Sequence, residues 1–122
     1  MNKERIAKLR EVIIEDIEYA LDHGEQPHFD MDHWFRTTED DRPMTYAGSR
    51  RHQFVGNLPT ELACGTTFCA AGWAVYLWRA EAEPGELIED AAQRILGLTD
   101  EQAEIFYQDD DVALDVLERW SA

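Results

Sequence analysis

The sequence predicts a mainly α protein with a single domain over residues 1–122, in which about five helices pack around a buried central helix. Two observations support this prediction. Residues 63–78 contain no charged side chain, although 30% of the chain is charged. Elsewhere, apolar residues recur at intervals of three and four, the spacing that places side chains on one face of a helix. A chain of 122 residues can bury one core without disulfides.

The uncharged stretch predicts the central helix at about residues 67–80. Apolar side chains surround this helix on every side, which is typical of a helix with several neighbours. The run is shorter than the ~20 residues that cross a bilayer. Thr66 or Thr67 is the expected N-cap, and Cys69 is expected in the first turn. Pro84 ends the helical region because proline cannot continue a helix.

The first helix is expected at residues 3–22. Asn2 is its expected cap and Gly24 its expected stop. The apolar face of this helix is expected to point into the core. It consists of Ile6, Leu9, Ile13, Ile17, Ala20 and Leu21, widened by Val12 and Ile14.

Three shorter helices are expected after the central one. Residues 86–96 form the first, which Gly97 ends. Thr99 and Gln102 have the spacing of a capping box and begin the second. Residues 109–111 are all aspartates and begin the last helix, because negative charge is favourable at a helix N-terminus. A calcium loop is a weaker interpretation of these aspartates, since the required glycine is missing.

Residues 25–62 are expected to be irregular or weakly β. Over residues 29–33, Phe29, Met31 and His33 alternate with two aspartates. This alternation permits a short extended piece or a single turn that fixes aromatic side chains on the core. The structured alternatives are a hairpin that pairs residues 44–47 with 52–55, and a helical turn at residues 59–62.

The net charge of the chain limits the kinds of partner that it can bind. The net charge is −15, and residues 63–122 hold 13 acidic and 3 basic residues, a net charge of −10. Such a surface repels nucleic acid and anionic lipid and favours a protein with a basic surface. Solubility alone is the simpler interpretation. The N-terminal residues lack the apolar run of a signal peptide, so a cytoplasmic location is expected.

Ten carboxylates in the last 40 residues are expected to form one acidic face that binds a basic partner. They are Glu86, Glu89, Asp90, Asp100, Glu101, Glu104, Asp109, Asp110, Asp111 and Asp115.

Two cysteines and two histidines are the first candidates for a metal or thiol site: Cys64, Cys69, His33 and His52. Zinc sites usually combine two close ligand pairs, and the sequence has no second close pair. Two buried thiols that pack as small apolar groups are the alternative interpretation. We therefore expect no metal, no cofactor and no catalytic residue.

Three motifs resemble those of a group of small proteins from bacteriophages and their bacterial hosts. They are Phe29-Asp30-Met31-x-x-Trp34, then Cys64-Gly65-Thr66-x-x-Cys69-x-Ala71-Gly72-Trp73-Ala74, then Ile95-Leu96-Gly97-Leu98 with Phe106 downstream. The group carries no established activity. The resemblance implies a phage or prophage context and transfers no catalytic residues.

Together these observations predict a non-enzymatic, acidic interaction protein of phage type in the bacterial host cell, which binds a basic protein surface as an inhibitor or a mimic of nucleic acid. A small metal- or thiol-dependent enzyme that uses Cys64, Cys69 and a histidine is one alternative. A homodimer or larger homo-oligomer is another, with Trp34 and Trp120 as its contact residues.

Overall fold

The computed structural model describes residues 1–32, 34–36, 53–62 and 66–122. Most of the described residues are helical, so the predicted mainly α fold is confirmed. The elements in chain order are α1 (Lys3–His23), β1 (Phe35–Arg36), the 3₁₀ turn η1 (Val55–Asn57), β2 (Thr67–Phe68), α2 (Ala70–Leu77), η2 (Arg79–Glu81), α3 (Ile88–Leu96), η3 (Gln102–Tyr107) and α4 (Asp110–Ser121).

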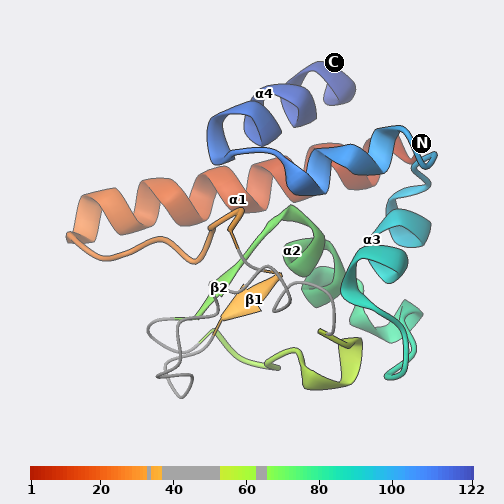
Figure 1. The fold of residues 1–122 in the computed structure, drawn as a ribbon. Helices are drawn as coiled ribbons and strands as arrows, with labels where there is room; N and C mark the ends of the chain where they lie inside the picture. The colour runs from red at the N-terminus through yellow and green to blue at the C-terminus, as the bar shows by residue number, and fades with distance from the viewer. Residues whose placement is uncertain (33, 37–52, 63–65) are drawn as a thin grey trace.

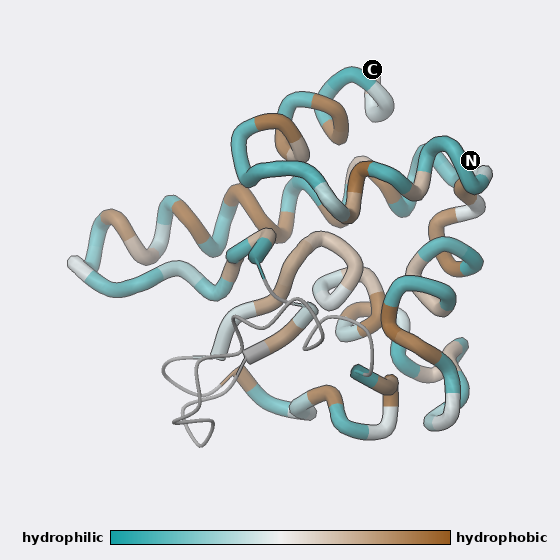
Figure 2. The backbone as a smooth tube through the Cα atoms, in the orientation of Figure 1, coloured by the Kyte–Doolittle hydropathy of each residue, from teal (hydrophilic) through white to brown (hydrophobic). Residues whose placement is uncertain are grey.

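The helices form layers on either side of α1. Figure 1 shows α4 on one side of this long helix and α2, α3 and the two short strands on the other. Residues 70–75 of α2 are all buried, so this helix occupies the centre, as the uncharged stretch predicts. In Figure 2, teal and brown alternate along α1, as expected for an amphipathic helix with one face on the core.

The central helix begins later than predicted. Thr67 and Phe68 are extended and pair with β1, in the antiparallel register Phe35 with Phe68. The N-cap is therefore Cys69, whose Sγ accepts the backbone N–H of Gly72 at 3.4 Å. The predicted threonine caps, and the place of Cys69 in the first turn, are wrong because the sheet contact holds the preceding residues extended.

The predicted ends of the other helices are largely confirmed. The Asn2 side chain accepts the backbone N–H of Arg5, and Gly24 ends α1 with a φ of 65°. Gly97 ends α3 in the same left-handed conformation, which glycine adopts without strain. The predicted capping box is present. Thr99 Oγ1 accepts the backbone N–H of Gln102 at 3.1 Å, and Gln102 Oε1 accepts the backbone N–H of Thr99 at 3.0 Å. The helix that follows is 3₁₀ rather than α.

Several details of the sequence prediction are wrong. Leu21 is 77% exposed rather than inward-facing. Residues 59–62 form no helical turn, and the chain bends at residues 60–61.

The predicted hairpin of residues 44–47 with 52–55 stays a prediction, because residues 37–52 lie outside the described residues. Phe54 itself pairs with Leu87 in an isolated antiparallel bridge.

Candidate functional site

A short extended segment carries two aspartates to the edge of the sheet. The backbone of Phe68 accepts the N–H of Asp30 at 3.0 Å and donates its own N–H to His28 at 2.9 Å. Asp30 then turns the chain, because its Oδ1 accepts the backbone N–H of Asp32 at 2.9 Å. Phe29 and Met31, the apolar residues of this alternation, are buried. The aspartates consequently face outward from a firmly attached turn.

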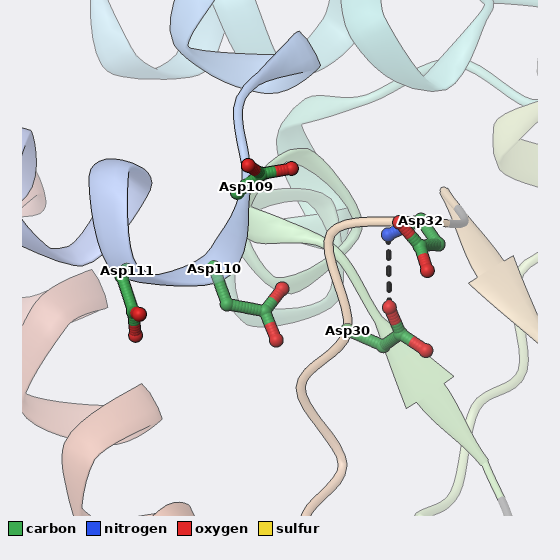
Figure 3. A pocket seen from close by; sticks show the side chains of 5 residues that line it. All are labelled: Asp30, Asp32, Asp109, Asp110 and Asp111. Carbon is green, nitrogen blue, oxygen red and sulfur yellow. Dashed lines mark hydrogen bonds between the residues drawn. The ribbon is translucent and has the colours of Figure 1, made fainter.

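The N-terminus of α4 meets this turn. Asp109 is the N-cap residue of α4, and Asp110 and Asp111 form the start of its first turn. Asp110 Oδ1 accepts the backbone N–H of Met31 at 2.8 Å, which joins α4 to the turn. Figure 3 shows the Asp110 carboxylate pointing toward the turn. The prediction that these aspartates begin the last helix is confirmed.

Five aspartates line one pocket of about 300 Å³ between the turn and α4: Asp30, Asp32, Asp109, Asp110 and Asp111. None of them forms a salt bridge with another of the described residues. We call this group the aspartate pocket. Its walls present carboxylate oxygens and backbone, so the group that it suits is a cation or a strong hydrogen-bond donor.

The carboxylates of the aspartate pocket influence one another. Burial raises the pKa of Asp110 above its ordinary value of 3.8, and the Met31 N–H lowers it in part. The negative charges of Asp30, Asp32 and Asp111 raise the pKa further, since each disfavours a second charge nearby. A cation in the pocket would offset the repulsion between these carboxylates.

The structure brings together only part of the predicted acidic face. Asp109, Asp110 and Asp111 share the pocket, whereas Asp115 lies one turn on and pairs with Arg119 at 3.5 Å. The other predicted carboxylates lie on α3, η3 and the segments beside them: Glu86, Glu89, Asp90, Asp100, Glu101 and Glu104.

Glu86 and Asp100 have partners within the described part of the chain. Glu86 pairs with Arg94, and the backbone N–H of Glu83, followed by the Arg94 guanidinium, lowers the pKa of Glu86. Asp100 accepts the Gln93 side-chain amide at 2.8 Å. Glu86 is thus already paired with a cation, whereas none of the pocket aspartates forms a salt bridge within the described part of the chain.

The predicted acidic face does not include Asp30 and Asp32, which line the aspartate pocket. Their alternation with apolar residues predicted an extended backbone but not the neighbour that this backbone meets. Contact between residues 30–32 and 109–111 is long-range, and no local pattern encodes it.

Of the four candidate metal and thiol residues, the structure describes Cys69. Cys64, His33 and His52 lie outside the described residues, and Cys69 is fully buried beside the Trp34 carbonyl. Among the described residues, no group of three or more histidines, cysteines or acidic residues is arranged to hold a metal ion. Trp34 is 1% exposed and therefore cannot be the predicted oligomer contact.

Comparison of the chain with protein-family models, with curated protein sequences and with solved structures gives no match. Within the described residues, no helix is both long and apolar enough to cross a membrane.

Proposed function

We propose that this chain is a non-enzymatic interaction protein that binds a basic surface of another protein, with the aspartate pocket as the place where a partner lysine or arginine is held. The observation that supports this proposal is the pocket itself. Five aspartates from two separate segments line it, and none has a salt-bridge partner among the described residues.

The chemistry of the pocket favours a side-chain cation. Ammonium and guanidinium groups donate several hydrogen bonds to carboxylates, and such charged bonds are about twice as strong as neutral ones. The cation would also offset the mutual repulsion that adds to burial in raising the pKa of Asp110. The net charge of −15 would attract a basic partner from a distance and speed its encounter.

The resemblance to phage proteins suggests where such a partner is found. In a bacterial host cell, basic surfaces that bind nucleic acid are grooves lined by lysine and arginine. An acidic protein can occupy such a groove in place of the phosphates, as an inhibitor or mimic of nucleic acid. This proposal places the protein in the host cytoplasm.

The test uses a labelled peptide of about 20 residues rich in lysine and arginine, with binding followed by fluorescence anisotropy. We expect the triple variant Asp109→Asn, Asp110→Asn and Asp111→Asn to bind about tenfold more weakly than the unaltered protein. Asparagine is also a good residue at a helix N-terminus, so α4 is retained. Affinity should fall steeply as the salt concentration rises.

The matched control changes the same number of charges outside the pocket. Its substitutions are Asp100→Asn, Glu101→Gln and Glu104→Gln, all at exposed positions. A loss of no more than about threefold is expected for this control. Equal losses in the two triple variants would show that only net charge matters, and the role of the pocket would be refuted.

A further inference from the structure

One flank of α1 is covered along only part of its length. Arg10, Ile14, Ile17 and Leu21 follow one another at spacings of four, three and four residues, so they lie on the same flank of the helix. Arg10 approaches Glu118 of α4 at 3.9 Å, which shows that α4 covers the beginning of this flank.

Toward its C-terminus, α1 continues past the point at which α4 begins (Figure 1). Ile14 and Ile17 are half-buried there, and Ile17 also packs against the core. Leu21 is 77% exposed, the highest value among the large apolar side chains of the described residues. We call Ile14, Ile17 and Leu21 the open flank of α1. The open flank follows Arg10, whose contact with Glu118 lies at the α1–α4 interface, along the same side of α1.

The surroundings of the open flank are acidic. Residues 11–32 contain eight aspartates and glutamates and no lysine or arginine. Glu18 precedes Leu21 by three residues and is its neighbour on the helix surface. Glu15 and Asp22 extend this exposed row of charge along α1. Glu15, Glu18 and Asp22 form no salt bridge with another of the described residues. An apolar strip bordered by such negative charge is complementary to a surface that is apolar and positive.

We infer that the open flank of α1 docks a cationic amphipathic helix from another protein, laid along α1 beyond the beginning of α4. Apolar side chains at positions i, i+3 and i+7 are the anchors by which one helix packs on another. Lysines and arginines beside the partner's apolar strip would face Glu18 and its acidic neighbours. The inference rests on the proposed function only for the sign of the partner's charge.

Charge also argues against two other occupants. A second copy of this chain would bring a like-charged row against Glu15, Glu18 and Asp22, which is unfavourable. An anionic bilayer would be repelled in the same way. The basic helix is the occupant that satisfies both the apolar and the acidic part of this surface.

The test uses a synthetic peptide of 18 leucines and lysines arranged as an amphipathic helix, and a second peptide of the same composition in scrambled order. Binding is measured by anisotropy near physiological salt. We expect the ordered peptide to bind more tightly than the scrambled one, and the variant Leu21→Gln to weaken it about tenfold. The exposure of Leu21 means that this variant should fold normally, which circular dichroism checks.

The matched control is Tyr19→Ala, on the opposite flank of the same helix and 58% exposed. It should change affinity less than twofold. Equal effects of Leu21→Gln and Tyr19→Ala, equal binding of the two peptides, or no binding at all would overturn the inference. So would a Leu21-dependent dimer in sedimentation, or Leu21-dependent binding to vesicles of phosphatidylglycerol.

The pocket variants separate this inference from the proposed function. Both variants are measured with the ordered leucine–lysine peptide. If the triple asparagine variant loses affinity for it and Leu21→Gln does not, the aspartate pocket holds the partner and the docking site on α1 is refuted. If only Leu21→Gln loses affinity, the docking site stands and the proposed role of the pocket fails.

Discussion

At the scale of single residues, the close approach of α2 to the Trp34 backbone depends on a glycine. Gly72 lies in the first turn of α2, where the helix touches the backbone of residue 34. A Cβ placed on Gly72 would lie 2.1 Å from the Trp34 carbonyl oxygen and 3.0 Å from the Phe68 Cβ. Both distances are shorter than ordinary contacts, so no side chain fits without movement of the backbone.

We therefore expect Gly72→Ala to destabilise the protein by about 2 kcal/mol, the cost of overpacking a core. The sign is informative, because the same change in an open helix position stabilises by ~1 kcal/mol. Urea unfolding followed by circular dichroism measures the loss. Gly85→Ala is the control: no atom lies within 4 Å of its Cβ, and its effect should be under ~0.5 kcal/mol. Similar losses in both variants would contradict the proposed contact.

The sequence shows small residues in this turn, but it does not show the carbonyl that they meet. Cys69 was likewise predicted two or three positions past the N-cap, whereas it is the N-cap itself. Its Sγ accepts the Gly72 N–H, while the Trp34 carbonyl lies 3.7 Å from the same sulfur. The pairing of β1 with β2 fixes this arrangement, and two-residue strands leave no periodic signal in a sequence.

At the scale of elements, Asp16 fixes the segment that follows α1. Its Oδ2 accepts the backbone N–H of His28 at 2.7 Å. The ring of His28 contacts the Thr66 carbonyl through Nδ1 at 2.6 Å, and its own carbonyl accepts the indole N–H of Trp73 at 3.0 Å. Through His28, these bonds join α1 to α2 and to Thr66, the residue that precedes β2. They also determine where Asp30 leaves the sheet.

The pKa of Asp16 makes this junction sensitive to pH. Burial raises the pKa above 3.8, more than the His28 N–H and the His28 charge lower it. Because the folded-state pKa is the higher one, the contribution of Asp16 to stability is greatest below pH 3.8. It is lost as the pH rises through the folded-state value.

Asp16→Asn keeps an oxygen acceptor for His28 and removes the charge. We expect this variant to be more stable than the unaltered protein at pH 7, by ~0.5 kcal/mol for a partly exposed group, with no gain at pH 3. Urea unfolding at the two pH values measures the difference. Glu15→Gln, its exposed neighbour, should show little change at either pH. A gain for Asp16→Asn that was equal at pH 3 and pH 7 would refute the mechanism.

Local signals predicted the elements better than their contacts. The caps and stops of α1 and α3 follow from single residues, such as Asn2, Gly24 and Gly97, and the structure confirms them. Leu21 was misplaced because it lies at the edge of the apolar face of α1: Ala20, one position earlier, is buried, whereas Leu21 is turned about 100° away from it. A hydrophobic pattern indicates which face of a helix is apolar, not how far around the helix its neighbours extend.

At the scale of the whole molecule, negative charge is the dominant property of the surface. The chain has 26 acidic and 11 basic residues. The described residues form five salt bridges, so most carboxylates have no such partner within the described part of the chain. The sequence predicted this excess of charge directly. It could not predict that Asp30 and Asp32 join the aspartates of α4, since that depends on the packing of the whole chain.

A net charge of −15 on a small domain opposes folding, because the folded state holds like charges closer together than the unfolded chain does. Salt screens this repulsion: the screening length falls to about 10 Å at 0.1 M. We therefore expect sodium chloride to stabilise the protein. Between about 20 mM and about 300 mM, the gain should be ~1 kcal/mol, or roughly 4 °C in Tm, measured by thermal circular dichroism at pH 7.

The triple variant Asp109→Asn, Asp110→Asn and Asp111→Asn tests the source of this gain. It lacks three negative charges where they are most crowded, so its Tm at low salt should be higher and its response to sodium chloride smaller. If attraction dominated instead, salt would weaken pairs such as Arg5 with Glu81 and lower the Tm of both proteins. A fall in Tm with added salt would therefore show that the surface is balanced by its ion pairs, and would remove the electrostatic basis for binding a basic partner.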